Sequence, residues 1–484
     1  MAFEPPGIAG GPAEPGPGAH GPFQGALFPG GLPIELLATG LRWPGRRGRS
    51  AYVAYRDLLH VAVTGRGLRL ATTSAIHTLS RRRLGDLPVQ LQLLAALRGR
   101  IGELPDGEER LRRMEALDRL YAEAGPPRLT QALLLVCAAL FALQLWDDAV
   151  TQAGALRTGL LELEPWRAVT GQFLHAPFEG IPAFLSPHLL LNGIGLWALG
   201  GFIERQLRPA RTTLVLAASG LGAAWCSALA AYPWVVGASG LVMGLAGALL
   251  VMEFLRPERV PAPWRLPRVI LVAVIAGDLL FTAGLPGIAA AAHFGGLLFG
   301  AAGATWVTRG GPVGASPGPA LRGLAIASLA GSALCFLALG WAVLAPEQAL
   351  SRRAGLLLED REISPVVLND EAWTIATSEE PSRDLLQLAE RLAVRAVEKT
   401  RRRNPNLLDT LAEILFQLGD DFEAVDLIDE AILLSPAEPY FREQRRRFLG
   451  ERDPDDRPEP PGSRPAPAPE APSPIPRDED ALVV

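Results

Sequence analysis

Four polar residues stand out because each lies inside a long apolar segment. They are His188, Asn192, Ser239 and His293. A polar group inside hydrocarbon is costly unless it is satisfied, so each one needs a reason. A serine hydroxyl becomes a useful nucleophile when a neighbouring base, most often a histidine, accepts its proton. The set therefore predicts nucleophilic catalysis by a serine and a histidine.

The spacing of these residues also predicts donors for a tetrahedral oxyanion. His188 and Asn192 are four residues apart, so they share one face of a helix. Ser239 stands between Gly237 and Gly240, which allow close approach of a neighbouring helix and of a substrate. Ser239 also lies in the first turn of its expected span, whose positive N-terminal end favours an anion. We expect His188, Asn192 and the backbone N–H of Ser239 to stabilise the oxyanion.

Apolar segments between residues 129 and 344 must position these side chains. Each is close to the roughly 20 residues that a helix needs to cross about 30 Å of hydrocarbon. We expect seven spans, at 129–146, 187–203, 212–231, 236–253, 269–284, 287–307 and 323–344. The four polar residues fall in the first turns of the second, fourth and sixth spans, which all enter the membrane from the same face. Their side chains should therefore lie at a similar depth.

Arginine is distributed unevenly among the connections between the spans. Nine arginines follow the second, fourth and sixth spans, whereas none follows the third and fifth. By the positive-inside rule the N-terminus is cytoplasmic, and an odd number of spans places the C-terminus on the opposite side. We expect a multi-pass integral membrane protein, most simply of a bacterial inner membrane.

The soluble parts of the chain differ in composition from the spans and from each other. Short alternating apolar runs between Ser50 and Leu84 predict a small antiparallel β-sheet, followed by helices from Pro88 and from Glu108. Between Asn404 and Pro436 the pattern predicts an antiparallel helix pair similar to a tetratricopeptide repeat, with a degenerate earlier copy near residue 372.

The expected fold is an all-α polytopic membrane protein with a small N-terminal α+β module and a C-terminal α-helical repeat domain. Its parts are a disordered Gly/Pro-rich leader (1–35), the N-terminal soluble module (36–126), a core of six transmembrane helices (127–310), a seventh transmembrane helix (320–345), the tetratricopeptide-like helical domain (350–450) and a disordered Pro/acid-rich tail (451–484).

Composition excludes several classes of function. The 484 residues include 46 basic and 51 acidic ones, and a net charge of −5 argues against a nucleic-acid partner. The three cysteines all lie in apolar runs, so we expect neither a disulfide framework nor a metal site, and no cofactor. His20, His60, His77 and His175 are expected to be non-catalytic. For Asp278, in the fifth span, we expect a structural hydrogen bond to a neighbouring helix.

In order and spacing, the motifs of the spans strongly resemble those of the rhomboid intramembrane serine proteases. The matching residues are Glu164-Pro165-Trp166-Arg167, His188-Leu189-Leu190-Leu191-Asn192, Gly200-Gly201-Phe202-Ile203-Glu204, Gly237-Ala238-Ser239-Gly240 with Gly244, and Ala292-His293-Phe294-Gly295-Gly296 with Gly300. The resemblance covers about residues 129–307 and implies a six-helix rhomboid core, to which the last span adds a seventh helix.

The resemblance also implies a role for each matched position. Ser239 would be the nucleophile and His293 the general base, a dyad without a catalytic carboxylate, and His188 and Asn192 would stabilise the oxyanion. It further implies structural roles: Trp166 and Arg167 would seat the first loop in the membrane interface, and Gly296 and Gly300 would let the sixth span pack on the fourth. Gly237 and Gly240 belong to the structural motif around Ser239. Ala238 precedes Ser239, whereas inactive relatives often have proline there.

These observations favour an intramembrane serine endopeptidase that cleaves peptide bonds in or near transmembrane helices. Its partners would be membrane-protein substrates, the lipid bilayer and proteins bound by the C-terminal helical repeats. The alternative is a catalytically silent rhomboid-like scaffold that binds client transmembrane helices. A transporter is a weaker alternative, because its spans would be expected to carry paired charges or Gly/Pro breaks near mid-membrane.

Overall fold

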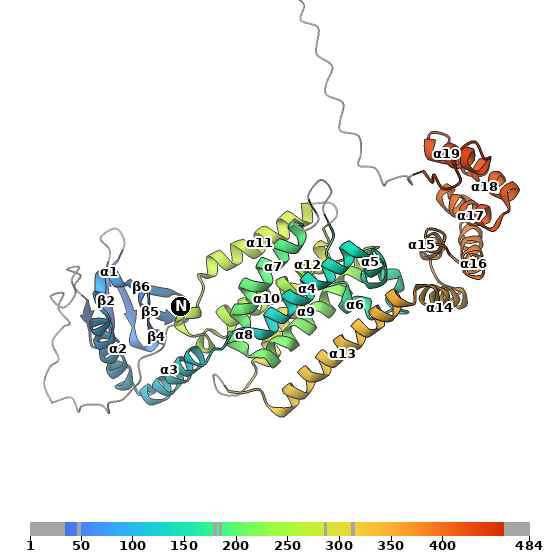
Figure 1. Cartoon of the computed structure of the whole chain (residues 1–484). Helices are drawn as coiled ribbons and strands as arrows, with labels where there is room; N and C mark the ends of the chain where they lie inside the picture. The colour runs from blue at the N-terminus through green and yellow to red at the C-terminus, as the bar shows by residue number, and fades with distance from the viewer. Residues whose placement is uncertain are drawn as a thin grey trace, which may run out of the picture. The chain divides into compact units, whose positions relative to one another are not determined.

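The computed structural model describes residues 34–45, 50–177, 182, 186–284, 288–310 and 315–458. Residues 1–33 of the expected leader and 459–484 of the expected tail lie outside these ranges. The chain divides into two compact units, Met1–Val343 and Leu344–Val484. The first unit contains the N-terminal module and the apolar helices, and the second is wholly helical where it is described (Figure 1).

In its described residues, 34–45 and 50–126, the N-terminal module has six strands in two antiparallel sheets, β1-β2-β3 and β4-β5-β6. The strands are β1 (Glu35–Leu36), β2 (Gly40–Pro44), β3 (Ser50–Ala54), β4 (Leu58–Thr64), β5 (Gly67–Thr72) and β6 (Ile76–Ser80). Three helices follow: α1 (Arg81–Leu84), α2 (Leu87–Gly102) and α3 (Gly107–Ala122). The expected small sheet is thus two sheets, because the 3₁₀ turn Tyr55–Asp57 separates β3 from β4. Leu68 of β5 and Leu93 and Leu97 of α2 are fully buried in their shared core.

The rest of the first unit is a bundle of apolar helices with a folded first loop (Figure 1). The helices are α4 (Arg128–Trp146), α5 (Ala149–Gly154), α6 (Arg167–Thr170), α7 (Pro187–Gly195), α8 (Gly201–Leu207), α9 (Pro209–Leu229), α10 (Ser239–Leu250), α11 (Arg268–Gly284), α12 (Ala290–Val307) and α13 (Pro319–Leu344). A π-helical turn, Leu196–Gly200, joins α7 to α8, and another, Val251–Leu255, extends α10. Short 3₁₀ turns occur at Thr158–Leu160, Pro257–Arg259 and Ala262–Trp264.

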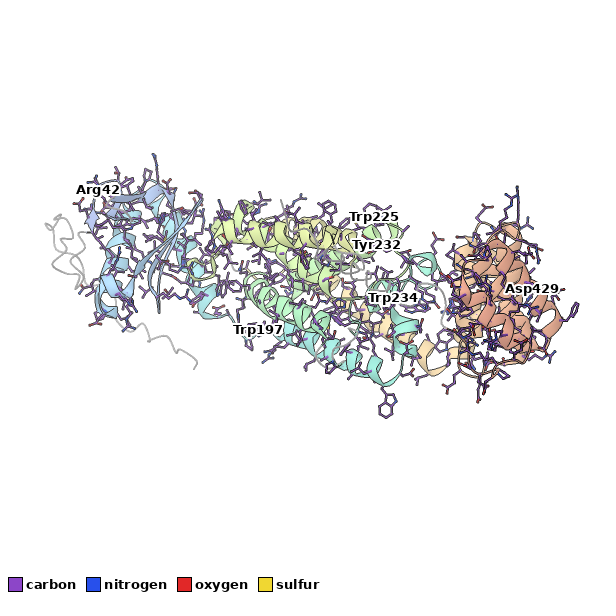
Figure 2. All side chains as sticks on the ribbon, turned by 90° about the horizontal axis from the view of Figure 1, so that it is seen from above. Arg42, Trp197, Trp225, Tyr232, Trp234 and Asp429 are labelled. Carbon is purple, nitrogen blue, oxygen red and sulfur yellow. The ribbon has the colours of Figure 1, made fainter. Side chains whose placement is uncertain are left out.

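Five helices in the described part of the chain are long and apolar enough to cross a membrane. They are α4, α9, α11 with the turn before it, α12 and α13. The second and fourth expected spans coincide with α7–α8 and with the shorter apolar helix Ser239–Leu255. Large apolar side chains cover the outside of the bundle, as Figure 2 shows for Trp197 and Trp225, which are 68% and 55% exposed. Such a surface suits lipid, and the protein is an integral multi-pass membrane protein.

The N-terminal module is fastened to the connection that precedes α11. His60 of β4 accepts a hydrogen bond at Nδ1 from the backbone N–H of Ala262, at 2.9 Å. Arg69 of β5 donates to the carbonyls of Pro263 and Arg265. The buried side chain of Arg265 donates in turn to the carbonyl of Thr72 at the end of β5. This contact could not be predicted from the sequence, since none of its residues belongs to a recognisable motif.

Up to residue 458, where its description ends, the second unit packs six helices around its own core. They are α14 (Pro346–Glu359), α15 (Pro365–Ala376), α16 (Arg383–Lys399), α17 (Pro405–Leu418), α18 (Asp421–Leu434) and α19 (Pro439–Phe448). The expected helix pair is α17–α18: Gly419 ends α17 with φ of +90°, and the Asp420 side chain caps α18. The pair α15–α16 lies where the earlier copy was expected. The likeness to a tetratricopeptide repeat stays a prediction.

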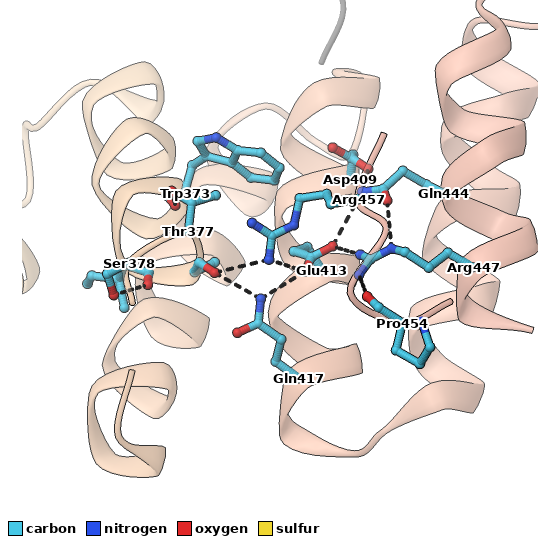
Figure 3. Close-up of polar contacts among 12 residues, drawn as sticks. Trp373, Thr377, Ser378, Asp409, Glu413, Gln417, Gln444, Arg447, Pro454 and Arg457 are labelled. Carbon is cyan, nitrogen blue, oxygen red and sulfur yellow. Dashed lines mark hydrogen bonds and ion pairs between the residues drawn. The ribbon is translucent and has the colours of Figure 1, made fainter. Parts of the chain in front are cut away.

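A buried polar network holds the centre of this second unit together (Figure 3). Glu413 is fully buried and forms ion pairs with Arg447 and Arg457. Arg457 also lies over the ring of Trp373. Arg457 falls in the segment expected to be a disordered tail, but the structure describes residues 451–458 and pairs the Arg457 guanidinium with the buried Glu413 carboxylate.

Candidate active site

The backbone that leads into Ser239 is held by the first loop. Leu156 and Val235 form an isolated antiparallel bridge, and the N–H of Gly237 donates to the carbonyl of Gly171 at 2.9 Å. Gly237 has φ of +123°, a conformation that side chains with a Cβ rarely adopt. The first loop therefore determines the direction in which the chain enters α10.

Arg167 and Trp166 brace this loop from the inside. Arg167 is 0% exposed; its Nε donates to Glu164 at 2.5 Å and its Nη1 to the carbonyls of Gln152 and Ala155 at 2.8 and 2.9 Å. Trp166 is 9% exposed, and its indole N–H lies 3.4 Å from the carbonyl of Ala153. The Arg167 guanidinium therefore holds the first loop in its fold. That Trp166 and Arg167 seat this loop in the membrane interface stays a prediction.

His188 and Asn192, both on α7, converge on Gly237. A Cβ added to Gly237 would lie 2.5 Å from Nε2 of His188 and 3.7 Å from Nδ2 of Asn192. Nδ1 of His188 accepts a hydrogen bond from the N–H of Ala176 at 3.3 Å, so a neutral His188 carries its proton on Nε2. Nδ2 of Asn192 donates one hydrogen to the carbonyl of His188 at 3.0 Å and keeps the other. Both side chains can therefore offer an N–H group beside Gly237, the residue two positions before Ser239.

Ser239 is the first residue of α10 and is only partly buried. The helix that it begins is packed closely on α12, which carries His293. A Cβ on Gly296 would lie 2.1 Å from the carbonyl oxygen of Gly240, and one on Gly300 would lie 2.3 Å from Cα of Gly244. The expected close packing of these glycines is therefore present.

His293 lies in the turn of α12 that faces the start of α10. Its neighbours along the helix, Ala292 and Gly296, both approach Gly240, the residue after Ser239. His293 is 7% exposed. The structure thus brings the N-terminal ends of α7, α10 and α12 together. This agrees with the similar membrane depth that the sequence predicted for their polar residues.

Asp278 of α11 is the unforeseen neighbour of this group. Its Oδ2 lies 3.0 Å from Nδ1 of His293. The expected interhelical hydrogen bond of Asp278 is present, but its partner could not be read from the sequence. His175, expected to be non-catalytic, packs its ring edge-on to that of His188 with ring centroids 5.1 Å apart.

Comparison with known proteins agrees with this arrangement. A model of the Rhomboid domain matches residues 162–310, which include α7 to α12 and every motif residue above. The chain is 32% identical over 203 residues to the rhomboid protease GlpG of Yersinia pestis, covering 41% of this chain and 68% of the relative. The same shares hold for GlpG of Yersinia enterocolitica and of Yersinia pseudotuberculosis. The chain belongs to the rhomboid family.

Glu204, another residue of the rhomboid motifs, lies outside the candidate site and links α8 to the start of α4. It is buried at the end of the α7–α8 span and accepts hydrogen bonds from the N–H groups of Leu129 and Thr130 at 2.9 Å, and from the Thr130 hydroxyl at 2.8 Å. A carboxylate there satisfies the free N–H groups at the start of α4. In the described residues of this rhomboid, no group of three or more His, Cys, Asp or Glu side chains is placed to hold a metal ion.

Proposed function

We propose that this rhomboid is an active intramembrane serine endopeptidase that cleaves peptide bonds in or near the transmembrane helices of other membrane proteins. Ser239 is the nucleophile and His293 the general base. The observation that carries the proposal is the convergence of His188, Asn192 and the His293 turn of α12 on the backbone around Ser239. This arrangement supplies the three parts that acyl transfer needs, namely a nucleophile, a base and oxyanion donors.

The proposed reaction starts when the Ser239 hydroxyl attacks the substrate carbonyl and its proton passes to His293. The negative charge that develops on the carbonyl oxygen is stabilised by N–H groups of His188, Asn192 and the Ser239 backbone. The intermediate then collapses, the leaving amine takes the proton from His293, and water hydrolyses the acyl-enzyme with His293 as base again. Ser239 is only partly buried, which supports access of both water and substrate.

A substrate helix must expose a carbonyl before Ser239 can attack it, because a hydrogen-bonded helix hides its carbonyls. We therefore propose substrates with Gly, Pro or other small residues near the cleaved bond. A panel of reporters that differ only at those positions tests this proposal, and equal cleavage of all members would contradict it.

We also propose the membrane arrangement that the arginine pattern favours. The chain crosses a bacterial inner membrane seven times, with the N-terminal module in the cytoplasm and the second unit on the opposite side. On that side the helical unit would bind substrate ectodomains or partner proteins. A topology reporter fused after residue 350 tests the orientation, and cleavage of native substrates after deletion of residues 350–458 tests the role of the helical unit.

Cleavage of a tagged single-span reporter by detergent-purified protein tests the catalytic proposal. Wild type should cut the reporter, whereas Ser239→Ala and His293→Ala should not. Ser227→Ala is the matched control, because Ser227 is another serine of the bundle, fully buried, and its hydroxyl donates to the carbonyl of Ala223 within its own helix. Undiminished cutting by Ser239→Ala would contradict the proposal. A cellular phenotype that survives Ser239→Ala would instead favour the silent scaffold.

A further inference from the structure

Helix α11, which coincides with the fifth expected span, carries one acidic side chain on the face that packs against the bundle. Its buried residues are Leu271, Ile275 and Thr282, spaced by four and seven positions along one helix face. Asp278 stands three residues after Ile275 and four before Thr282, so it lies on that same face. A carboxylate in an apolar helix is costly without a partner. The partner present is His293, the base of the proposed reaction, at 3.0 Å.

This hydrogen bond has a direct consequence for the imidazole ring. An ionised carboxylate only accepts hydrogen bonds, so Nδ1 of His293 must carry the proton. Nε2 then keeps its lone pair and is the atom able to receive the proton of Ser239. The bond also spans two helices, which fixes the plane of the ring relative to α11 and α12.

We propose that Asp278 is a positioning residue for His293. It selects the tautomer with a basic Nε2, holds the ring in place and stabilises the imidazolium that forms when Ser239 loses its proton. The inference rests on the proposed function of Ser239 and His293. It departs from what the family resemblance implies, since a dyad needs no carboxylate, whereas this chain places one on the base.

Three substitutions of Asp278 separate this role from a structural one. An Asn amide facing Nδ1 can favour the opposite tautomer, in which Nε2 is protonated and cannot act as a base. In a Ser-His-Asp protease that change lowers kcat by about 10⁴. Asp278 keeps 36% of its side chain exposed and the amide can rotate, so we expect a smaller loss here. We expect about 10²-fold for Asp278→Asn, about tenfold for Asp278→Ala and less for Asp278→Glu, with KM unchanged throughout.

The order of these effects is diagnostic. Asn has nearly the shape of Asp, so loss of packing alone would make Asp278→Ala the worst variant. Imposing the wrong tautomer makes Asp278→Asn the worst. A structural role would also lower the thermal unfolding midpoint in step with activity.

The experiment uses the full-length protein in detergent with the single-span reporter. It measures kcat and KM separately, the rate at which a fluorophosphonate probe labels Ser239, and the unfolding midpoint. Thr282→Val is the matched control, because it removes a buried hydroxyl one turn further along the same face of α11. Ser239→Ala gives the background for both cleavage and labelling.

We expect the labelling rate and kcat to decrease from wild type through Asp278→Glu and Asp278→Ala to Asp278→Asn, which is the slowest. The unfolding midpoints of these variants should stay close to those of wild type and Thr282→Val. Asp278→Asn with wild-type kcat and labelling, while Ser239→Ala is inactive, would overturn the inference and leave the proposed function intact. Asp278→Ala as the slowest variant with a matching loss of thermal stability would also overturn it. Full cleavage by Ser239→Ala would instead overturn the proposed function.

Discussion

Replacing Gly296 by alanine should disable the site without touching a reacting group. A Cβ there would lie 2.1 Å from the carbonyl oxygen and 3.0 Å from Cα of Gly240, where ordinary contact begins at 3.4 Å. All the atoms it meets are backbone, so α10 and α12 must separate by about 1 Å rather than rotate a side chain aside. His293 precedes Gly296 by one turn and Ser239 adjoins Gly240. A displacement of about 1 Å between reacting groups can lower the rate about 10²-fold.

The matched control is Gly303→Ala on the same helix, where the atoms nearest to a Cβ would be Ala218 Cβ at 3.2 Å, Val215 Cα at 3.5 Å and the Leu214 carbonyl oxygen at 3.9 Å. Strain at Gly296 should lower the free energy of unfolding by about 1–3 kcal/mol, offset by the roughly 1 kcal/mol helix preference of alanine over glycine. Gly303→Ala should gain the stability that alanine gives a helix, with little added strain. Reporter cleavage and the unfolding midpoint check both variants, and wild-type cleavage by Gly296→Ala would refute the packing argument.

Three further predictions concern the parts outside the site. Arg265→Met should lower the free energy of unfolding of the first unit by about 3–5 kcal/mol, because it leaves the buried Glu253 carboxylate without its partner at 2.7 Å; thermal unfolding checks this, and adding Glu253→Gln should restore much of the loss. His60→Ala removes the acceptor of the Ala262 N–H, so hydrogen exchange at that amide should accelerate about tenfold or more, and an unchanged rate would show that the module is held elsewhere. Burial raises the pKa of Asp409 to about 7, above the roughly 3.9 of an unfolded aspartate. The folded second unit therefore binds the extra proton, and its stability should fall as pH rises from about 4 through 7. Asp409→Asn should flatten that dependence in denaturant unfolding measured at several pH values.

The sequence predicted the elements better than their contacts. Apolar length located the helices, and the order of His188, Ser239 and His293 along them predicted which ends would meet. Periodicity also located α17 and α18, whose inward residues are buried. These features depend on local composition and spacing, which a single sequence contains.

The features that could not be predicted from the sequence depend on which helix, strand and loop surfaces pack against each other. The resemblance pointed to Arg167 as a residue of the first loop, but no spacing in the sequence shows that its guanidinium bonds to the carbonyls of Gln152 and Ala155. His60 and Ala262 are 202 positions apart, and no pattern joins them. The spacing of Asp278 from Ile275 and Thr282 could have placed it on the inner face of α11. Identifying His293 as its partner requires the packing of α11 on α12.

The two histidines near Ser239 show how partners outside the reaction can assign roles within it. His188 receives a backbone N–H from Ala176 at Nδ1, and this leaves a proton on Nε2. His293 faces a carboxylate at Nδ1, and this leaves a lone pair on Nε2. In the proposed reaction the first must donate to the oxyanion and the second must accept from Ser239, so their tautomers need to be opposite. Ala176 belongs to the first loop and Asp278 to α11; in the proposed reaction these two elements would therefore assign the donor and the acceptor through hydrogen bonds to the two histidines.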